Sequence, residues 1–158
     1  MLSRSDVRQI LRTERRLLEL KQAAAKRLER SVDENDRLLD QRIVDDISVS
    51  LIYCERFRDM NRDVHDDQKV QGLEHLSAAV IHIWKLGDYL RSNMDQASSF
   101  HKRVLERVEQ WLNMINISQL SFSLAIYSKS LSQSLGAITD RMAEKKMDGD
   151  EQPNPGDA

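Results

Sequence analysis

The sequence predicts an all-α protein, an antiparallel helical bundle of four or five helices with a coiled-coil-like N-terminal helix. From residue 1 to residue 147 the chain contains no proline, and its only glycines are Gly72, Gly87 and Gly136. In a helix interior, proline costs about 3 kcal/mol and glycine about 1 kcal/mol relative to alanine. Apolar residues also recur every three or four positions, which is the period of an amphipathic helix. Both observations favour helix over nearly the whole chain.

The length of 158 residues suits one domain, which we place at residues 1–147. The remaining residues, 148–158, hold both prolines and four acidic side chains, and we expect this tail to be disordered. The N-terminus lacks the apolar region of a secretory signal, and apolar runs such as 78–81 are far too short to cross a membrane. The single cysteine, Cys54, has apolar neighbours that indicate a buried thiol. We therefore expect a cytoplasmic protein.

The net charge of −2 hides an asymmetry along the chain. Residues 1–30 contain nine Arg and Lys against four acids, whereas residues 31–68 contain five against eleven. One interpretation pairs the two segments as antiparallel neighbours whose charges set the register. The other makes the first segment a basic arm for nucleic acid or an acidic protein. We favour the first, because acids interrupt the basic run and no aromatic residue lies within it for stacking on bases.

The first helix begins after Ser3 or Ser5, either of which can cap its N-terminus. Two adjacent rows of apolar residues then repeat at heptad spacing. One row contains Ile10, Leu17, Ala24 and Leu38, and the other contains Leu11, Leu18, Ala25, Val32 and Leu39. Heptad spacing is typical of a coiled-coil seam, and the alanines would let a neighbouring helix approach closely. Leu11, Leu18, Ala25 and Val32 are therefore our candidate partner-binding residues.

The charged stretch 33–36 has two interpretations. It is either a turn in which Asn35 or Asp36 caps a second helix, or part of one continuous helix reaching to about residue 64. A continuous helix would be roughly 90 Å long and would need a partner chain, which makes an obligate dimer. We favour the turn, because the following apolar stripe has a shifted phase: Ile43, Ile47, Leu51, Cys54 and Phe57.

Two further helices follow, and each starts beside residues that favour an N-terminus. Asp66 and Asp67 precede the third helix, which has the most regular stripe in the chain: Leu73, Leu76, Val80, Ile83, Gly87, Leu90 and Met94. The loop 95–99 then precedes a fourth helix with Val104, Val108, Trp111 and Ile115 on one face. The stretch 113–118 is expected to kink or end that helix.

Helical spacing resumes at Ile117 and continues to Met142. This last segment carries seven serines between Ser118 and Ser134, which indicate a close-packed or weakly polar face, with a phosphorylation cluster as the alternative. Residues 120–124 also alternate apolar and polar with period two, so a short strand is the alternative there.

The four histidines are the natural candidates for chemistry. A di-iron bundle needs Glu-x-x-His pairs, but the residues three positions before His65, His75, His82 and His101 are Arg62, Gly72, Ala79 and Ser98. His75 and His82 are seven residues apart, too far along a helix to bind one ion as a pair at i and i+4 would. We accordingly predict no metal and no cofactor.

The segment 82–87, His-Ile-Trp-Lys-Leu-Gly, resembles the phosphoacceptor segment of histidine phosphotransfer domains. In those helical bundles a surface histidine accepts a phosphoryl group, and a lysine three residues later holds its charge, followed directly by glycine. Lys85 has the right offset from His82, but Leu86 replaces the glycine and Gly87 comes one position later. We favour a structural role, in which His82 flanks the core stripe of the third helix.

The segment 58–65 resembles the catalytic pattern of HEPN ribonucleases, which use an arginine, a polar residue and a histidine across a dimer to cleave RNA. Arg58, Asp59 and His65 match that pattern. The pattern is short and is expected by chance in a chain with 32% charged residues, so we favour a solvated helix end.

The function that the sequence favours is a non-catalytic protein–protein interaction or oligomerisation module. Its partner would be another protein or a second copy of the chain, and neither a membrane nor a small-molecule substrate is indicated. Trp84 and Lys85 complete the candidate partner-binding residues, because Trp84 falls away from the core stripe of its helix and would anchor an interface if exposed. Histidine phosphotransfer at His82 and RNA cleavage at Arg58 and His65 are the enzymatic alternatives.

Overall fold

The computed structural model describes residues 4–61 and 66–151. Over these ranges the backbone forms six α-helices and one short 3-10 helix. They are α1 (Arg4–Arg30), α2 (Glu34–Asn61), α3 (Asp66–Ser92), η1 (Met94–Gln96), α4 (Ser99–Met114), α5 (Ile117–Leu124) and α6 (Lys129–Glu151). The predicted all-α class is confirmed. Within the described residues there is one more helix than the upper bound of five, because the last predicted helix is divided into α5 and α6.

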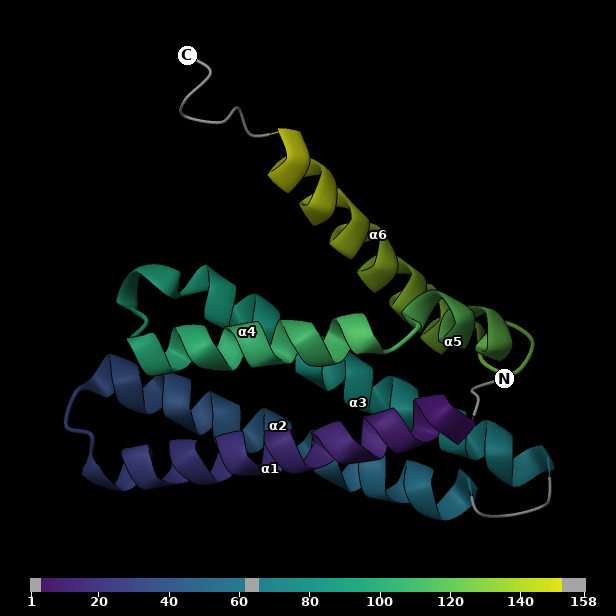
Figure 1. Cartoon of the computed structure of the whole chain (residues 1–158), viewed down its shortest axis with the longest axis horizontal. Helices are drawn as coiled ribbons and strands as arrows, with labels where there is room; N and C mark the ends of the chain where they lie inside the picture. Colours follow the sequence, from purple (N-terminus) through teal and green to yellow (C-terminus); the bar gives the residue numbers. More distant parts are fainter. Residues whose placement is uncertain (1–3, 62–65, 152–158) are drawn as a thin grey trace.

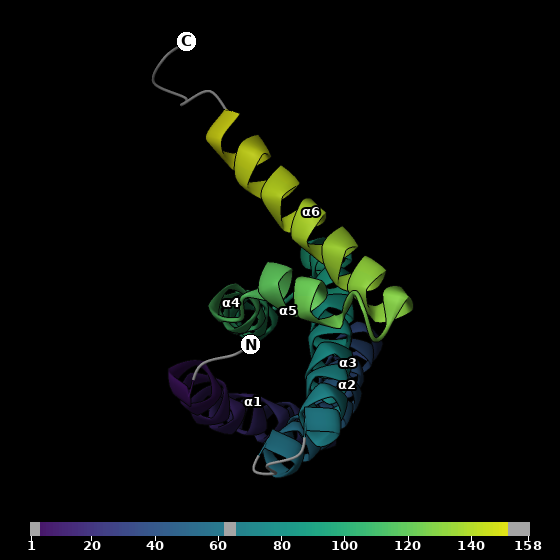
Figure 2. The same ribbon diagram turned by 90° about the vertical axis from the view of Figure 1, so that its right-hand side faces the viewer.

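The first four helices run alternately up and down and lie beside one another (Figure 1). α2 packs against both α1 and α3, α3 also contacts α4, and α1 and α4 touch along a shorter stretch. α5 and α6 form a second, smaller hairpin that packs mainly on α3. Figure 2 shows α6 running obliquely to the other helices, with its C-terminal end directed away from them.

The core is built from one inward stripe on each helix. α1 contributes Ile10, Leu17 and Ala24, all less than 3% exposed. The stripes predicted on α2 and α3 contribute Ile43, Ile47, Cys54, Phe57, Leu76, Val80, Ile83 and Leu90, and the helices from α4 onward add a further share of the buried apolar residues. Burial of each such aliphatic or aromatic side chain contributes about 1.5–3 kcal/mol, so these stripes hold the bundle together.

The chain turns between Arg30 and Glu34, so the turn interpretation of this stretch is confirmed. Asp33 caps α2, since its Oδ1 accepts a hydrogen bond from the backbone N–H of Asn35 at 3.1 Å. Arg37 Nη1 donates to the carbonyls of Leu28 and Ser31, each at 3.0 Å, and so satisfies carbonyls at the end of α1. The observed cap, Asp33, lies two residues before Asn35, the earlier of the two caps that the sequence suggested.

The turn at residues 125–128, between α5 and α6, was not predicted. Asn116 caps α5 through its side-chain oxygen, and Ser128 caps α6 by accepting from the N–H of Leu131. The two helices are joined by reciprocal hydrogen bonds, in which Ser121 Oγ donates to Ser132 O at 2.7 Å and Ser132 Oγ donates to Ser121 O at 2.9 Å. These serines therefore fasten a close helix pair, and the strand alternative for 120–124 is wrong because this stretch lies in α5.

α6 continues to Glu151, past the boundary at residue 147 that we predicted for the start of the tail. Residues 148–151 are thus helical, and residues 152–158 lie outside the described part of the chain.

Candidate functional site

The outer face of the α1–α2 hairpin contains an open groove of about 490 Å³. Its apolar floor is made by Leu11 and Leu18 of α1 with Leu51 and Ile52 of α2. Leu18 is 39% exposed and Ile52 is 50% exposed. Charged and polar side chains surround this floor: Glu14, Arg15, Lys21, Ser48, Glu55 and Arg58. We call this set of residues the α1–α2 groove.

The groove forms because the two apolar rows of α1 face different directions. Adjacent residues on a helix point about 100° apart, so only one row can face the centre of the bundle. The row with Ile10, Leu17 and Ala24 is buried in the core, while the row with Leu11 and Leu18 is turned toward the outer face. Of the two predicted rows, the one with Ile10, Leu17 and Ala24 is therefore the packing face of α1 within the bundle, and the one with Leu11 and Leu18 is not.

An ion pair closes one end of the α1–α2 groove. Arg58 Nη1 lies 3.6 Å from Glu14 Oε2, which links α2 to α1. Burial raises the pKa of Glu14 above its ordinary value, Arg58 opposes that effect, and Glu55 adds to it. Beneath the groove, burial raises the pKa of the Cys54 thiol to about 12, so the thiol stays protonated and unreactive at neutral pH.

The other predicted partner-binding residues lie apart from this groove. Ala25 is half-buried farther along α1, and Val32 is 95% exposed in the turn before α2. Lys85 is exposed on α3, as expected for a surface lysine. Trp84 is only 7% exposed, so the exposed anchor that we anticipated is not present. α6 covers this tryptophan, and Trp84 lines a separate pocket between α3, α4 and α6.

The histidine of the phosphotransfer resemblance is part of an aromatic stack. His82 is half-buried, and its ring lies 5.9 Å from that of Tyr53 at an interplanar angle of 19°. His75, two turns earlier on α3, stacks on the same Tyr53 at 6.0 Å. Burial lowers the pKa of His75, with Arg56 adding to the effect and Glu74 opposing it. The stack joins α2 to α3 through Tyr53.

The ribonuclease resemblance is only partly within the described structure. Arg58 points to α1, where it pairs with Glu14, and Asp59 is exposed. His65 lies outside the described residues.

A buried polar network joins α4 to the α1–α2 hairpin. It was not predicted from the sequence. His101 Nε2 lies 2.7 Å from Asp40 Oδ1, and both side chains are fully buried. Arg27 Nε lies 3.6 Å from the same carboxylate oxygen, and Arg27 Nη2 donates to Ser98 Oγ at 3.3 Å. The sequence signal was the spacing of Ser98 and His101, which form the capping box of α4.

Ser98, His101 and Asp40 are also the residue types of a hydrolase triad, and the Ser98 hydroxyl lies 2.9 Å from His101 Nδ1. That nitrogen, however, accepts the backbone N–H of Ser98 at 3.2 Å. Because Nδ1 accepts this bond, Nε2–H is the group that donates to Asp40. The lone pair that a general base would use is thus already engaged. The network joins α4 and its cap to α1 and α2.

The described residues contain no group of three or more His, Cys, Asp or Glu side chains placed to hold a metal ion. In the same part of the chain, no helix has both the length and the apolar character needed to span a membrane. Comparison with protein-family models, curated proteins and solved structures finds no match to this chain. The geometry of the groove is therefore the basis for a functional conclusion.

Proposed function

We propose that this chain is a non-catalytic self-association module, and that two copies pair through their α1–α2 grooves. The observation that carries the proposal is an open floor of four aliphatic side chains, enclosed by charges of both signs, on a face made by two long helices. Grooves of this kind take an amphipathic helix, whose apolar residues fill the floor while polar residues meet the rim. The coiled-coil-like spacing of Leu11 and Leu18 suits such helix-on-helix packing.

Charge complementarity favours a second copy as the occupant. Residues 1–30, which contain α1, carry an excess of five basic residues, and residues 31–68 carry an excess of six acidic ones. In a two-fold arrangement the α1 of one copy faces the α2 of the other, so basic and acidic sides meet twice. Of the rim residues, Arg15 and Lys21 on α1 and Glu55 on α2 follow this division, whereas Glu14 on α1 and Arg58 on α2 reverse it and are paired with each other. The interface would select antiparallel self-pairing by charge and gain affinity from the apolar floor.

The test is the oligomeric state of variants in the floor and outside it. Ile52→Glu places a charge in the centre of the proposed interface, and the variant should remain monomeric at concentrations where the wild type is dimeric. Val32→Glu is the matched control, because Val32 is 95% exposed but does not line the groove. Sedimentation equilibrium on both variants shows whether the dimer contact is confined to the groove or extends along the whole heptad row as far as Val32. Dimer loss in Val32→Glu with retention in Ile52→Glu would contradict the proposal.

A cytoplasmic location belongs to this proposal. The protonated buried thiol of Cys54 suits a reducing compartment. Cell fractionation with an antibody to the chain tests the location.

The two enzymatic alternatives rest on their sequence resemblances and each has a direct test. Transfer of ³²P from a phosphorylated receiver domain to the wild type, lost in His82→Gln, would support phosphotransfer. Cleavage of RNA that is lost in His65→Ala would support the ribonuclease alternative.

A further inference from the structure

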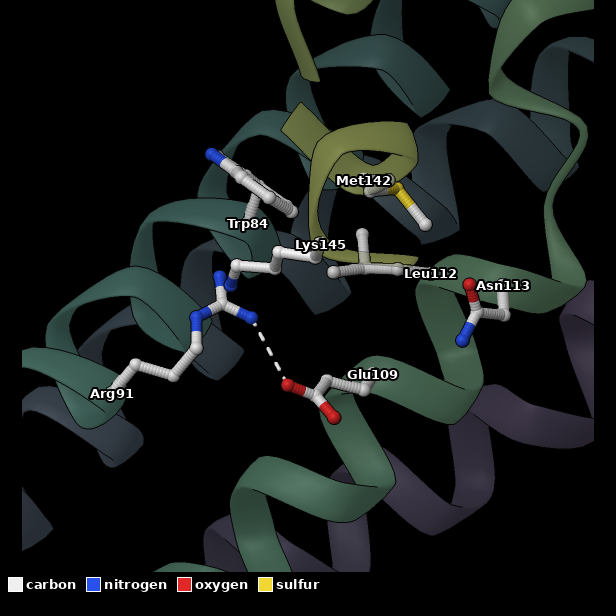
Figure 3. Close-up of a pocket in the computed structure, with 7 residues that line it drawn as sticks. All are labelled: Trp84, Arg91, Glu109, Leu112, Asn113, Met142 and Lys145. Carbon is white, nitrogen blue, oxygen red and sulfur yellow. Dashed lines mark hydrogen bonds and ion pairs between the residues drawn. The ribbon is translucent and has the colours of Figure 1, made fainter. Parts of the chain in front are cut away.

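A second cavity, of about 230 Å³, lies where α3, α4 and α6 meet, away from the α1–α2 groove. Its residues combine apolar and charged groups: Trp84, Arg91, Glu109, Leu112, Asn113, Met142 and Lys145 (Figure 3). Trp84, Leu112 and Met142 form an apolar wall, while Arg91 and Lys145 supply two cations. We call this the α3–α4–α6 pocket.

Both cations are held against the indole of Trp84. The guanidinium carbon of Arg91 lies 4.9 Å from the ring centroid, and Lys145 Nζ lies 5.4 Å from it. In Figure 3 the two cationic groups lie on the same side of the ring. Cation–π attraction accounts for the position of each group taken singly, but it leaves two like charges beside each other in a partly desolvated site.

The carboxylates near the pocket leave this charge incompletely neutralised. Arg91 Nη1 donates to Glu109 Oε1 at 3.0 Å, while Arg91 Nε and Nη2 are buried with no hydrogen-bond partner among the described residues. Among the residues that line the pocket, the cations Arg91 and Lys145 face a single carboxylate, Glu109, which leaves an excess of one positive charge. Burial lowers the pKa of Lys145, and Arg91 lowers it further, as two cations at close quarters should.

From the paired cations and the apolar wall, we propose that the α3–α4–α6 pocket binds a small monocarboxylate with an apolar body. One negative charge between Lys145 and Arg91 would balance the single excess positive charge and relieve the repulsion between the two cations. The apolar body of the ligand would lie against Trp84, Leu112 and Met142. A ligand of this kind matches the pocket better than inorganic phosphate, which has no apolar part and carries more charge at neutral pH.

The site also has a structural consequence, because its residues come from three helices. Lys145 and Met142 belong to α6, whereas Trp84 and Arg91 belong to α3 and Glu109 and Leu112 to α4. A bound carboxylate would hold α6 on the bundle and raise the stability of the folded state by mass action.

The experiment uses the full-length protein and the indole N–H signal of Trp84 in ¹H–¹⁵N spectra. Only two tryptophans are present, so Trp84→Phe assigns the signal. The protein is titrated separately with hexanoate, hexanol and inorganic phosphate. Hexanol has the apolar body without the charge, and phosphate has the charge without the body. Lys145→Met keeps most of the aliphatic side chain and removes the cation, and Lys85→Met makes the same change on an exposed lysine outside the pocket.

We expect a saturable shift of the Trp84 signal with hexanoate and no saturable shift with hexanol. Lys145→Met should weaken hexanoate binding about tenfold or more, as expected for loss of a charge-assisted contact, whereas Lys85→Met should not change it. Absence of saturable binding, or equal affinity in Lys145→Met, would overturn the site. Phosphate binding as tight as that of hexanoate would overturn the proposed carboxylate chemistry. A melting curve of each variant confirms that the fold is retained.

Discussion

The two helical hairpins of this protein, α1–α2 and α5–α6, are held together by different chemistry. The α1–α2 hairpin is rich in charge, and its exposed apolar residues Leu18 and Ile52 are enclosed by ions of both signs. Between residues 110 and 139, which include α5 and the first half of α6, the only charged residue is Lys129. There, serine hydroxyls join the helices, and Phe122, Ile126 and Tyr127 are 82%, 89% and 62% exposed.

This contrast separates two uses of exposed apolar surface. A charged rim gives the α1–α2 groove a means to select one partner and one register, because unlike charges attract and like charges repel. The α5–α6 turn has exposed apolar residues without such a rim. Under the proposed function, selective self-association belongs to the first hairpin and not to the second, and the following predictions test that division from the largest effect to the smallest.

Removal of Asp40 should have the largest effect, because this residue joins the α1–α2 hairpin to α4. Asp40→Ala leaves the Nε2–H of His101 and the guanidinium of Arg27 without their buried carboxylate. Loss of one member of a buried charged network typically costs about 3–5 kcal/mol. Urea denaturation followed by circular dichroism should show the free energy of unfolding lowered by about 3 kcal/mol. A loss under about 1 kcal/mol would mean that the network does not fasten α4.

A charge placed in each exposed apolar surface should distinguish the two hairpins directly. Leu18→Glu should weaken the proposed dimer by about 100-fold or more, since it removes a buried contact of about 1.5–3 kcal/mol and adds a desolvated charge. Phe122→Glu makes a comparable change on the other hairpin and should leave the dimer dissociation constant unaltered. Analytical ultracentrifugation gives both values. The opposite result would place self-association on the α5–α6 turn.

The serine contacts of the second hairpin should contribute a smaller, local stability. Ser121→Ala with Ser132→Ala removes the reciprocal bonds between α5 and α6, and we expect a loss of about 1–2 kcal/mol. Hydrogen exchange should become faster in α5 and α6 and stay unchanged in α1 and α2. Faster exchange throughout the chain would show that the two hairpins are not energetically distinct.

Salt should have the smallest effect, limited to the charged hairpin. If rim charges of opposite sign meet across the dimer, a rise from 0.05 M to 0.5 M salt should increase the dissociation constant by about two- to tenfold, because exposed ion pairs are screened. If association stays constant or becomes tighter at high salt, the rim charges do not contribute to pairing, and the apolar floor alone accounts for the dimer.

Local patterns predicted the bundle but not the relations between distant helices. The stripes of α2 and α3 and the turn before Glu34 followed from helical period and capping residues. The choice between the rows of Leu17 and Leu18 did not follow, because both have heptad spacing and differ only in which one meets the rest of the bundle. Trp84 was misjudged for a similar reason: it lies at the edge of the α3 stripe and is covered by α6, from a much later segment of the chain.

The buried network shows the same limit for polar residues. Asp40 and His101 are 61 residues apart, and each is an ordinary charged or polar residue in its own helix. Their partnership depends on how α4 packs against α2, which no local spacing records. The turn at 125–128 contains neither glycine nor proline, so the sequence has no strong local signal that would divide the last predicted helix into α5 and α6.

The most direct test of the central claim is the mass of the wild-type chain and of Leu18→Glu by size-exclusion chromatography with light scattering, over a range of concentrations. We predict that the wild type approaches twice the 18.3 kDa of one chain as concentration rises, and that Leu18→Glu remains at 18.3 kDa with an unchanged circular dichroism spectrum. A wild-type protein that stays monomeric up to high micromolar concentration would contradict self-association through the α1–α2 groove.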